Sequence, residues 1–213
     1  MTLPIIEHRS VIKQQPPPSK FSLRGFPAKR IPAGRKVFRQ HKEKYQPWYF
    51  SNNDGRFTLD PPRGSLYLTS TAKAAALEHV GQNCAKLGWI DAGLVTGRVI
   101  SELELPHAVK LAYCTSQKAI KWRIIVNELS TMPDYKTPRM WAKSFEEAGF
   151  DGIWTTLRFS VPQARSLILF GESGVRDWPI ADTRSLREVC EAIGIYVVDD
   201  PASTALTVLR PSV

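Results

Sequence analysis

Alternating apolar and polar residues predict several short strands along the chain. In the segment GSLYLTS, Leu66 and Leu68 point to one side, whereas Ser65, Tyr67 and Thr69 point to the other. This period of two is typical of a strand with one buried face. Comparable runs predict strands in KVFRQ (36–40), GRVISELELP (97–106), HAVKLAYCTS (107–116), FDGIWTTL (150–157), SLILF (166–170), IYVVD (195–199) and TALTVL (204–209).

Apolar residues at helical spacing predict three helices. Ser70 or Thr71 can cap the first helix, which is expected to continue to about Asn83. The second helix is expected to begin with Thr137 as its N-cap and to stop at Gly149. Its predicted inner face consists of Trp141, Ser144, Phe145 and Ala148. The third helix is predicted in SLREVCEAIG (185–194), and residues 118–129 are apolar at both periods, so helix and strand both stay open there.

The order of these elements predicts the fold class. Strands and helices follow one another without a regular β–α–β alternation, which favours an α+β fold with a mixed, mostly antiparallel sheet. Residues 1–35 contain three consecutive prolines, scattered Lys and Arg, and little periodicity. We therefore expect an irregular, basic, Pro-rich N-terminal arm over residues 1–35 and a folded domain over residues 36–213.

The positive charge of the chain is concentrated near its N-terminus. Residues 1–44 hold 11 Lys and Arg against 2 Asp and Glu, whereas residues 45–213 hold 18 of each sign. The net charge of +9 is therefore assigned to the arm. A basic arm can attract nucleic acid, an acidic protein or an acidic membrane surface. We favour a solvated tail over a specific contact, so direct nucleic-acid binding is not expected.

Composition excludes several classes of protein. No run of about 18 apolar residues predicts a membrane span, and the first ten residues do not resemble a secretory signal. The three cysteines lie far apart, the four histidines are separated, and neither a P-loop nor a GxGxxG motif occurs. We therefore expect a cytoplasmic protein with no metal site and no bound cofactor.

A glutamate stands in the apolar stripe of the first predicted helix. Glu78 shares a face with Ala74, Leu77 and Gly81. Burying an ionised carboxylate alone costs several kcal/mol, so Glu78 needs a cation or a set of hydrogen bonds. The alternative is a boundary glutamate that bends out to water.

Two arginines upstream are candidate partners of this glutamate. Arg39 lies in the first predicted strand, and Arg56 follows the turn pair Asp54-Gly55. A guanidinium at either position can pair with Glu78 or hold a phosphate with its planar fork. The alternative for each is an ordinary surface arginine.

The order and spacing of these residues resemble a known family. An arginine in a first strand ("FRQ"), the turn "DGRF", the strand "SLYLTS" and the helix start "TAKAAALE" follow in register. Farther on come "WAKSFEEAGFDGIW" (141–154) and "LILF". Together these segments, over about residues 36–171, resemble the RES-domain family.

The resemblance implies a fold and an activity. Members of this family look like ADP-ribosyltransferases in fold, and several are bacterial toxins that act on NAD. The implied reaction is cleavage of the nicotinamide–ribose bond, with inorganic phosphate as acceptor in an NAD phosphorylase. Transfer of ADP-ribose to a protein is the enzymatic alternative, and a nucleic-acid- or protein-binding module that uses the basic arm is the non-enzymatic one. NAD is then a substrate rather than a cofactor, phosphate is a possible co-substrate, and an antitoxin that covers the active site is the implied protein partner.

The resemblance also implies roles for individual residues. Glu78 would stabilise the oxocarbenium-like ribose of the transition state. Arg39 and Arg56 would hold the pyrophosphate of NAD or orient a phosphate nucleophile. Tyr67 would lie against the nicotinamide or the ribose and exclude water.

One position departs from the family pattern. The family serine follows the D-G-I strand, and an ungapped match places Leu157 there. Thr156, or Ser160 with a shift, is the candidate for the missing hydroxyl, and we choose Thr156. Arg158 is expected to assist phosphate binding, with a surface arginine as the alternative.

Overall fold

A curved eight-stranded sheet forms the centre of the molecule. The computed structural model describes residues 13–18, 22–159 and 164–199. Among these residues the parallel pair of the large sheet is β7–β8, and its other neighbouring strands run antiparallel, as predicted. The strands, in spatial order, are β1 (Ala28–Ile31), β7 (Val109–Tyr113), β8 (Gly152–Thr155), β9 (Ser166–Glu172), β4 (Arg63–Thr69), β2 (Lys36–Lys42), β6 (Arg98–Glu104) and β11 (Ile180–Ser185).

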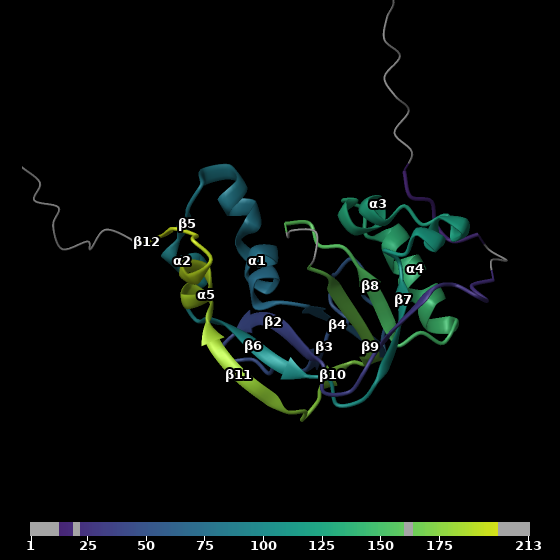
Figure 1. Ribbon diagram of the computed structural model, residues 1–213, viewed down its shortest axis with the longest axis horizontal. Coiled ribbons are helices and arrows are strands. Elements are labelled where there is room, and N and C mark those ends of the chain that lie inside the picture. The colour runs from purple at the N-terminus through teal and green to yellow at the C-terminus, as the bar shows by residue number, and fades with distance from the viewer. Residues whose placement is uncertain (1–12, 19–21, 160–163, 200–213) are drawn as a thin grey trace, which may run out of the picture.

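Helices cover the two ends of this sheet (Figure 1). The helix α4 (Lys136–Glu147) packs against β8, with α3 (Val126–Thr131) and the 3-10 helix η1 (Gln117–Trp122) in the same region of the chain. At the other end α1 (Ala72–Leu87) and α5 (Leu186–Ala192) lie over β2 and β6, next to α2 (Ala92–Val95). Two small sheets complete the fold: β3 (Tyr49–Phe50) pairs with β10 (Gly174–Val175), and β5 (Ile90–Asp91) pairs with β12 (Val197–Val198).

The buried side chains form three clusters, one for each packed face. One lies between the α3–α4 region and the sheet and contains Phe26, Trp141, Phe145 and Ile153. A second includes Trp48, Leu66, Leu68, Leu111 and Leu167. The third lies beneath α1 and α5 and includes Ala76, Val80, Ile100, Leu186 and Cys190. Leu66 and Leu68 pack in the second cluster and Tyr67 packs against the first, which confirms the alternation predicted for β4, although Ser65 and Thr69 are buried as well.

The first predicted helix forms as α1. The side chain of Thr71 accepts a hydrogen bond from the backbone N–H of Ala74 at 3.2 Å, so Thr71 is the N-cap. The helix ends at Leu87, four residues later than predicted, because Gly88 adopts the left-handed conformation that closes a helix (φ 76°).

The second predicted helix forms as α4, but its predicted start is wrong. Its N-cap is Tyr135, and Thr137 is buried inside the first turn. The carboxylate of Asp134 accepts a hydrogen bond from the backbone N–H of Lys136 at 2.9 Å, so the turn is already set before Thr137. Trp141 and Phe145 are buried as predicted, whereas Ala148 is exposed because the helix ends at Glu147.

Part of the predicted N-terminal arm belongs to the folded domain. β1 pairs with β7, and Leu23, Phe26 and Ile31 are buried, so the domain begins well before residue 36. Gln14 is 2% exposed: its Nε2 donates to the carbonyl of Arg123 at 3.0 Å, and its Oε1 accepts from the N–H of Ile125 at 2.7 Å. Residues 13–18, which we call the N-terminal strap, are thus tied to the α3–α4 region.

The other expectations for elements have mixed outcomes. Residues 118–129, where helix and strand both stayed open, lie mostly in η1 and α3, whereas β11 has no predicted counterpart. The strand predicted at 204–209 lies outside the described residues. No helix in the described part of the chain has the length and apolar character needed to cross a bilayer.

Candidate functional site

A cavity opens where two neighbouring strands of the large sheet separate. β2 and β4 share a single residue pair, Phe38 with Thr69. Beyond this pair the strands diverge and enclose a space of about 230 Å³ with α1 along one wall. The lining consists of Phe38, Arg39 and Gln40 from β2, Tyr67, Leu68 and Thr69 from β4, Ala75, Glu78 and His79 from α1, and also Leu157 and Ser166. Three predicted site residues, Arg39, Tyr67 and Glu78, therefore meet at one cavity.

Glu78 points toward this cavity. Its Oε1 accepts a hydrogen bond from the backbone N–H of Phe159 at 2.9 Å. Burial raises the pKa of the Glu78 carboxyl, and the backbone amides of Phe159 and Arg158 together with the charges of Arg158 and Arg56 oppose that rise. The carboxylate thus lines the cavity and also anchors the loop that follows β8.

That loop packs closely against α1. A Cβ atom built at Gly81 would lie 2.6 Å from Cγ of Phe159, so the glycine leaves room for the aromatic ring. The guanidinium of Arg158 lies 5.1 Å from the centroid of the same ring. Arg158 is exposed, and its charge reaches both Glu78 and Arg56. The inner face of α1 therefore holds the loop through Glu78 and Gly81, one helical turn apart.

Arg39 is fixed by backbone carbonyls on the other side of β2. Its Nη1 donates to the carbonyl of Tyr49 at 3.0 Å and also to that of Pro47. Burial lowers the pKa of Arg39 to about 10, and among the described residues no carboxylate forms an ion pair with it. A half-buried cation of this kind suits an anionic ligand.

Arg56 lies near Glu78 but does not line the cavity. Its Nη1 donates to the carbonyl of Met132, and its guanidinium lies 4.9 Å from the ring centroid of Tyr135. Burial lowers the pKa of Arg56, while the charges of Tyr135, Tyr67 and Glu78 oppose that effect. The charge of Arg56 thus acts on Glu78, whereas Arg39 lines the cavity from β2 and its guanidinium is held by carbonyls on the other side of that strand.

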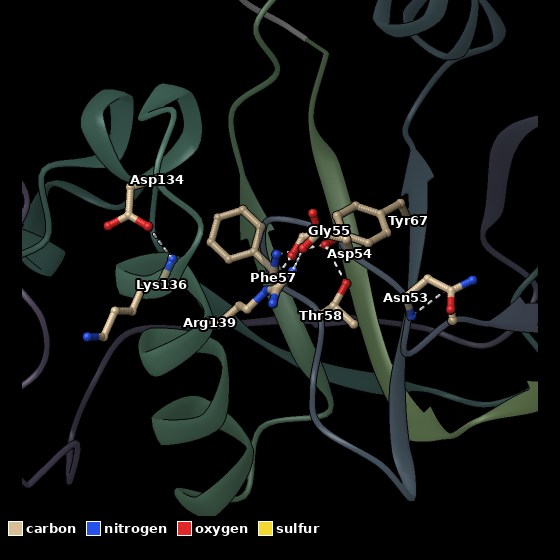
Figure 2. A network of polar contacts seen from close by, with 10 residues as sticks. Asn53, Asp54, Gly55, Phe57, Thr58, Tyr67, Asp134, Lys136 and Arg139 are labelled. Atoms are coloured by element: carbon tan, nitrogen blue, oxygen red, sulfur yellow. Dashed lines mark hydrogen bonds and ion pairs between the residues drawn. The ribbon is translucent and has the colours of Figure 1, made fainter.

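The turn that carries Arg56 is held between β4 and α4, as Figure 2 shows. The hydroxyl of Tyr67 accepts a hydrogen bond from the N–H of Phe57 at 2.7 Å. From α4, Arg139 donates to the carbonyl of Gly55 at 2.9 Å and pairs with Asp54.

Close contacts restrict this turn further. A Cβ at Gly55 would lie 2.5 Å from Oγ1 of Thr58 and 2.9 Å from the hydroxyl oxygen of Tyr67, so this position needs a glycine. The Tyr67 hydroxyl is engaged by the turn, which leaves its ring to line the cavity. Arg139 was not a candidate in the sequence, because an arginine on the polar side of a helix carries no signal of its contact with a distant turn.

The residues near the expected serine position are now placed. Leu157 lines the cavity, whereas Thr156 is half-buried and does not belong to the lining. Ser160 lies outside the described residues. A residue that sequence reasoning missed, the buried Ser166 at the start of β9, does line the cavity. As the first residue of an apolar strand, Ser166 looks in the sequence like an ordinary strand boundary.

His79 is another lining residue that was not predicted. Its Nε2 lies 3.3 Å from the carbonyl oxygen of Leu94, and burial together with the charge of Arg98 lowers its pKa. In the described residues no three His, Cys, Asp or Glu side chains gather in a way that would hold a metal ion.

Comparison with known proteins shows a shared fold. Neither a protein-family model nor a curated protein sequence matches the chain. The chain is similar in structure to a chain of the M. tuberculosis MbcT–MbcA toxin–antitoxin complex, with a TM-score of 0.59 and 10% sequence identity. The match covers 76% of this chain and 90% of the other. At this identity the similarity is one of fold.

Proposed function

We propose that this chain is an NAD-consuming enzyme that cleaves the nicotinamide–ribose bond and acts as the toxin of a toxin–antitoxin pair. The observation that carries the proposal is the meeting of Arg39, Tyr67 and Glu78, from three separate elements, at one cavity. The fold shared with a chain of a toxin–antitoxin complex supports it, as does the order of the motifs that resemble the RES-domain family.

The chemistry of the lining suits this reaction. Loss of nicotinamide leaves an oxocarbenium-like ribose, whose positive charge a fixed carboxylate stabilises. The hydrogen bond from Phe159 orients the carboxylate of Glu78, so that little reorganisation is needed during the reaction. Nicotinamide is a good leaving group, and Glu78 is assigned no proton transfer.

The size of the cavity indicates which part of NAD it takes. At about 230 Å³ it is smaller than the roughly 300–1,000 Å³ of pockets that enclose a whole drug-sized ligand. We therefore place the nicotinamide and its ribose in the cavity, against the ring of Tyr67. The pyrophosphate would lie outside it, where the guanidinium groups of Arg56 and Arg158 can bind it.

We propose inorganic phosphate as the acceptor, which makes the chain an NAD phosphorylase. The test is to incubate the purified protein with NAD, with and without phosphate, and to identify the products by mass spectrometry. We expect nicotinamide and ADP-ribose-1''-phosphate, formed only with phosphate present. A labelled protein product that does not depend on phosphate would instead identify a protein ADP-ribosyltransferase.

The matched variant for this test is Glu78→Gln. It keeps the shape of the side chain and an acceptor for the N–H of Phe159, but removes the negative charge. We expect NAD turnover to fall about 100-fold or more. Turnover by this variant at the wild-type rate would show that Glu78 only anchors the loop.

An antitoxin that covers the mouth of the cavity is the protein partner of this proposal. Expression of the wild-type chain alone is expected to arrest growth and lower cellular NAD, and expression of the Glu78→Gln variant is not. Equal toxicity of the two chains would show that toxicity does not depend on this site.

A further inference from the structure

The amide of Gln40 stands out among the residues of the cavity. In the described part of the chain, its Nε2 is the one buried side-chain nitrogen or oxygen without a hydrogen-bond partner. Buried polar atoms are almost always paired, and an unpaired donor destabilises the fold relative to an apolar side chain of similar shape. When a residue with such an unpaired donor lines a cavity, a ligand of that cavity is a natural candidate for its partner.

The position of Gln40 on β2 explains why the protein offers it no partner. Arg39 and His41 face the side of the sheet where Nε2 of His41 contacts Oγ of Ser101 at 2.9 Å. Gln40, one residue along the strand, faces the opposite side, toward α1. There the strands have already separated, because the last pair between β2 and β4 is Phe38 with Thr69.

Two polar atoms on the facing wall have partners other than Gln40. Oε1 of Glu78 binds the N–H of Phe159, and Nε2 of His79 contacts the carbonyl of Leu94. Ala75, which also lines this wall, has no side-chain acceptor. Gln40 and Glu78 line the same cavity, and Nε2 of Gln40 has no hydrogen-bond partner there.

We infer that Gln40 is a substrate-binding residue whose amide N–H donates to an oxygen on the nicotinamide–ribose half of NAD. This inference rests on the proposed function and adds a group that recognises the substrate by a hydrogen bond. Two oxygens have the required chemistry, the carboxamide oxygen of nicotinamide and a ribose hydroxyl. Binding would supply the hydrogen bond that the empty fold lacks, so the donor favours the complex over the free protein.

The experiment compares Gln40→Leu with the wild-type enzyme in steady-state NAD turnover and in thermal unfolding. Leucine has similar bulk and no donor. We expect the KM for NAD to rise about tenfold, kcat to stay within about twofold, and the melting temperature to stay equal or rise. The matched control is Gln82→Leu, the same change at an exposed position of α1, which is expected to alter none of these values.

Product inhibition identifies the oxygen that Gln40 binds. If the carboxamide is bound, the variant is inhibited more weakly by nicotinamide; if a ribose hydroxyl is bound, it is inhibited more weakly by ADP-ribose-1''-phosphate. Gln40→Met, which keeps an unbranched side chain of similar length, replaces the leucine variant if that variant does not fold.

An unchanged KM with both inhibition constants unchanged would overturn the inference, and so would a clear fall in melting temperature in both Gln40→Leu and Gln40→Met, because the amide would then serve the fold. Wild-type protein that fails to consume NAD would overturn the proposed function itself. Wild-type turnover with an unaffected Gln40→Leu variant would leave the proposed function standing and remove only the role of Gln40.

Discussion

Glu78 lies at the cavity wall, where burial disfavours the ionised form of its carboxyl group. Burial raises its pKa, so the folded protein binds this proton more readily than the unfolded chain does. The contribution of Glu78 to stability therefore falls as pH rises through the ordinary value of 4.5 and up to the raised value. A residue that lowers stability near neutral pH is typical of a functional site.

This pH dependence gives a prediction for Glu78→Gln that does not require activity. The variant has no charge to bury and retains an acceptor for Phe159, so at about pH 7 its melting temperature is expected to equal or exceed that of the wild type. The difference is expected to vanish toward about pH 4, where the wild-type carboxyl is protonated in both states. Thermal unfolding followed by circular dichroism across this range measures it.

The control for this experiment is Glu147→Gln, at the exposed end of α4, where no such difference in melting temperature is expected. A Glu78→Gln variant that is less stable than the wild type near neutral pH would show that the fold needs the negative charge.

Replacement of Arg56 by lysine tests whether substrate binding needs the planar guanidinium group with its two parallel donors. In Arg56→Lys the charge is kept, but one ammonium cannot bind the carbonyl of Met132 and also present two parallel donors to a phosphate. We expect the KM for NAD to rise about tenfold, in steady-state assays beside Arg24→Lys, an exposed position that should show no effect. An unchanged KM would exclude Arg56 from substrate binding.

Sequence reasoning found the residues that carry a motif and missed those that do not. Helical spacing placed Glu78 on the same face as Ala74 and Gly81, but it left open a carboxylate that bends out to water. Its hydrogen-bond partner is a backbone amide 81 residues away, and backbone amides have no signature in a sequence. Gln40 and Ser166 were missed for a related reason: their importance depends on a separation of strands that no local pattern encodes.

At the scale of elements, the packing of the loop after β8 on α1 depends on a missing side chain. Gly81→Ala adds a residue favoured in helices by about 1 kcal/mol, but its Cβ would meet Phe159 at 2.6 Å. We expect the ring to be displaced, the N–H of Phe159 to leave Glu78, and both stability and NAD turnover to fall. Chemical denaturation and the NAD assay measure the two effects.

Making the Gly81→Ala change in a second variant separates the effect of the clash from the effect of helix propensity. In a Phe159→Ala protein the ring is absent, so Gly81→Ala is expected to stabilise the fold. The same sign of effect in both backgrounds would rule out the proposed contact.

The N-terminal strap gives a second prediction at this scale. Gln14→Ala leaves the carbonyl of Arg123 and the N–H of Ile125 without their partner in a partly buried place. We expect a loss of about 2 kcal/mol in the free energy of unfolding, measured with urea. Gln15→Ala is the control, because Gln15 is exposed and receives the indole N–H of Trp141 through its backbone carbonyl. Equal losses of unfolding free energy in the two variants would argue against stabilisation by the hydrogen bonds of the Gln14 side chain.

Two strands of the large sheet that sequence analysis missed, β1 and β11, share a physical cause. β11 is exposed along most of its length and β1 is buried mainly at Ile31, because both lie at the edges of the sheet. Edge strands show little alternation. The central strands β4 and β9 are buried and were found. The order of strands in the sheet could not be predicted, since it depends on contacts between distant segments.

For the whole molecule, the basic charge belongs largely to the folded surface. Most cations of residues 1–44 lie on or beside β1 and β2, and the strap holds the chain ahead of them. Removal of residues 1–35 is therefore expected to delete a strand and lower the melting temperature sharply. Removal of residues 1–12 keeps all the described contacts and is expected to leave NAD turnover and melting temperature unchanged.

The same pair of proteins tests the alternative of a nucleic-acid-binding module. Such a module would bind DNA or RNA with a steep dependence on salt concentration. We expect no such binding from the protein that lacks residues 1–12, measured by fluorescence anisotropy at low and physiological ionic strength. Tight, salt-sensitive binding together with absent NAD turnover would favour the module.

The cavity draws its walls from β2, β4 and α1, and closes them with Leu157 and with Ser166 from β9. In the sheet β9 lies between β8 and β4, so this late segment joins parts that are synthesised much earlier. A ribosome must release the chain beyond about residue 166 before the last wall can be added. During most of its synthesis a nascent copy consequently lacks the complete cavity on which the proposed function depends.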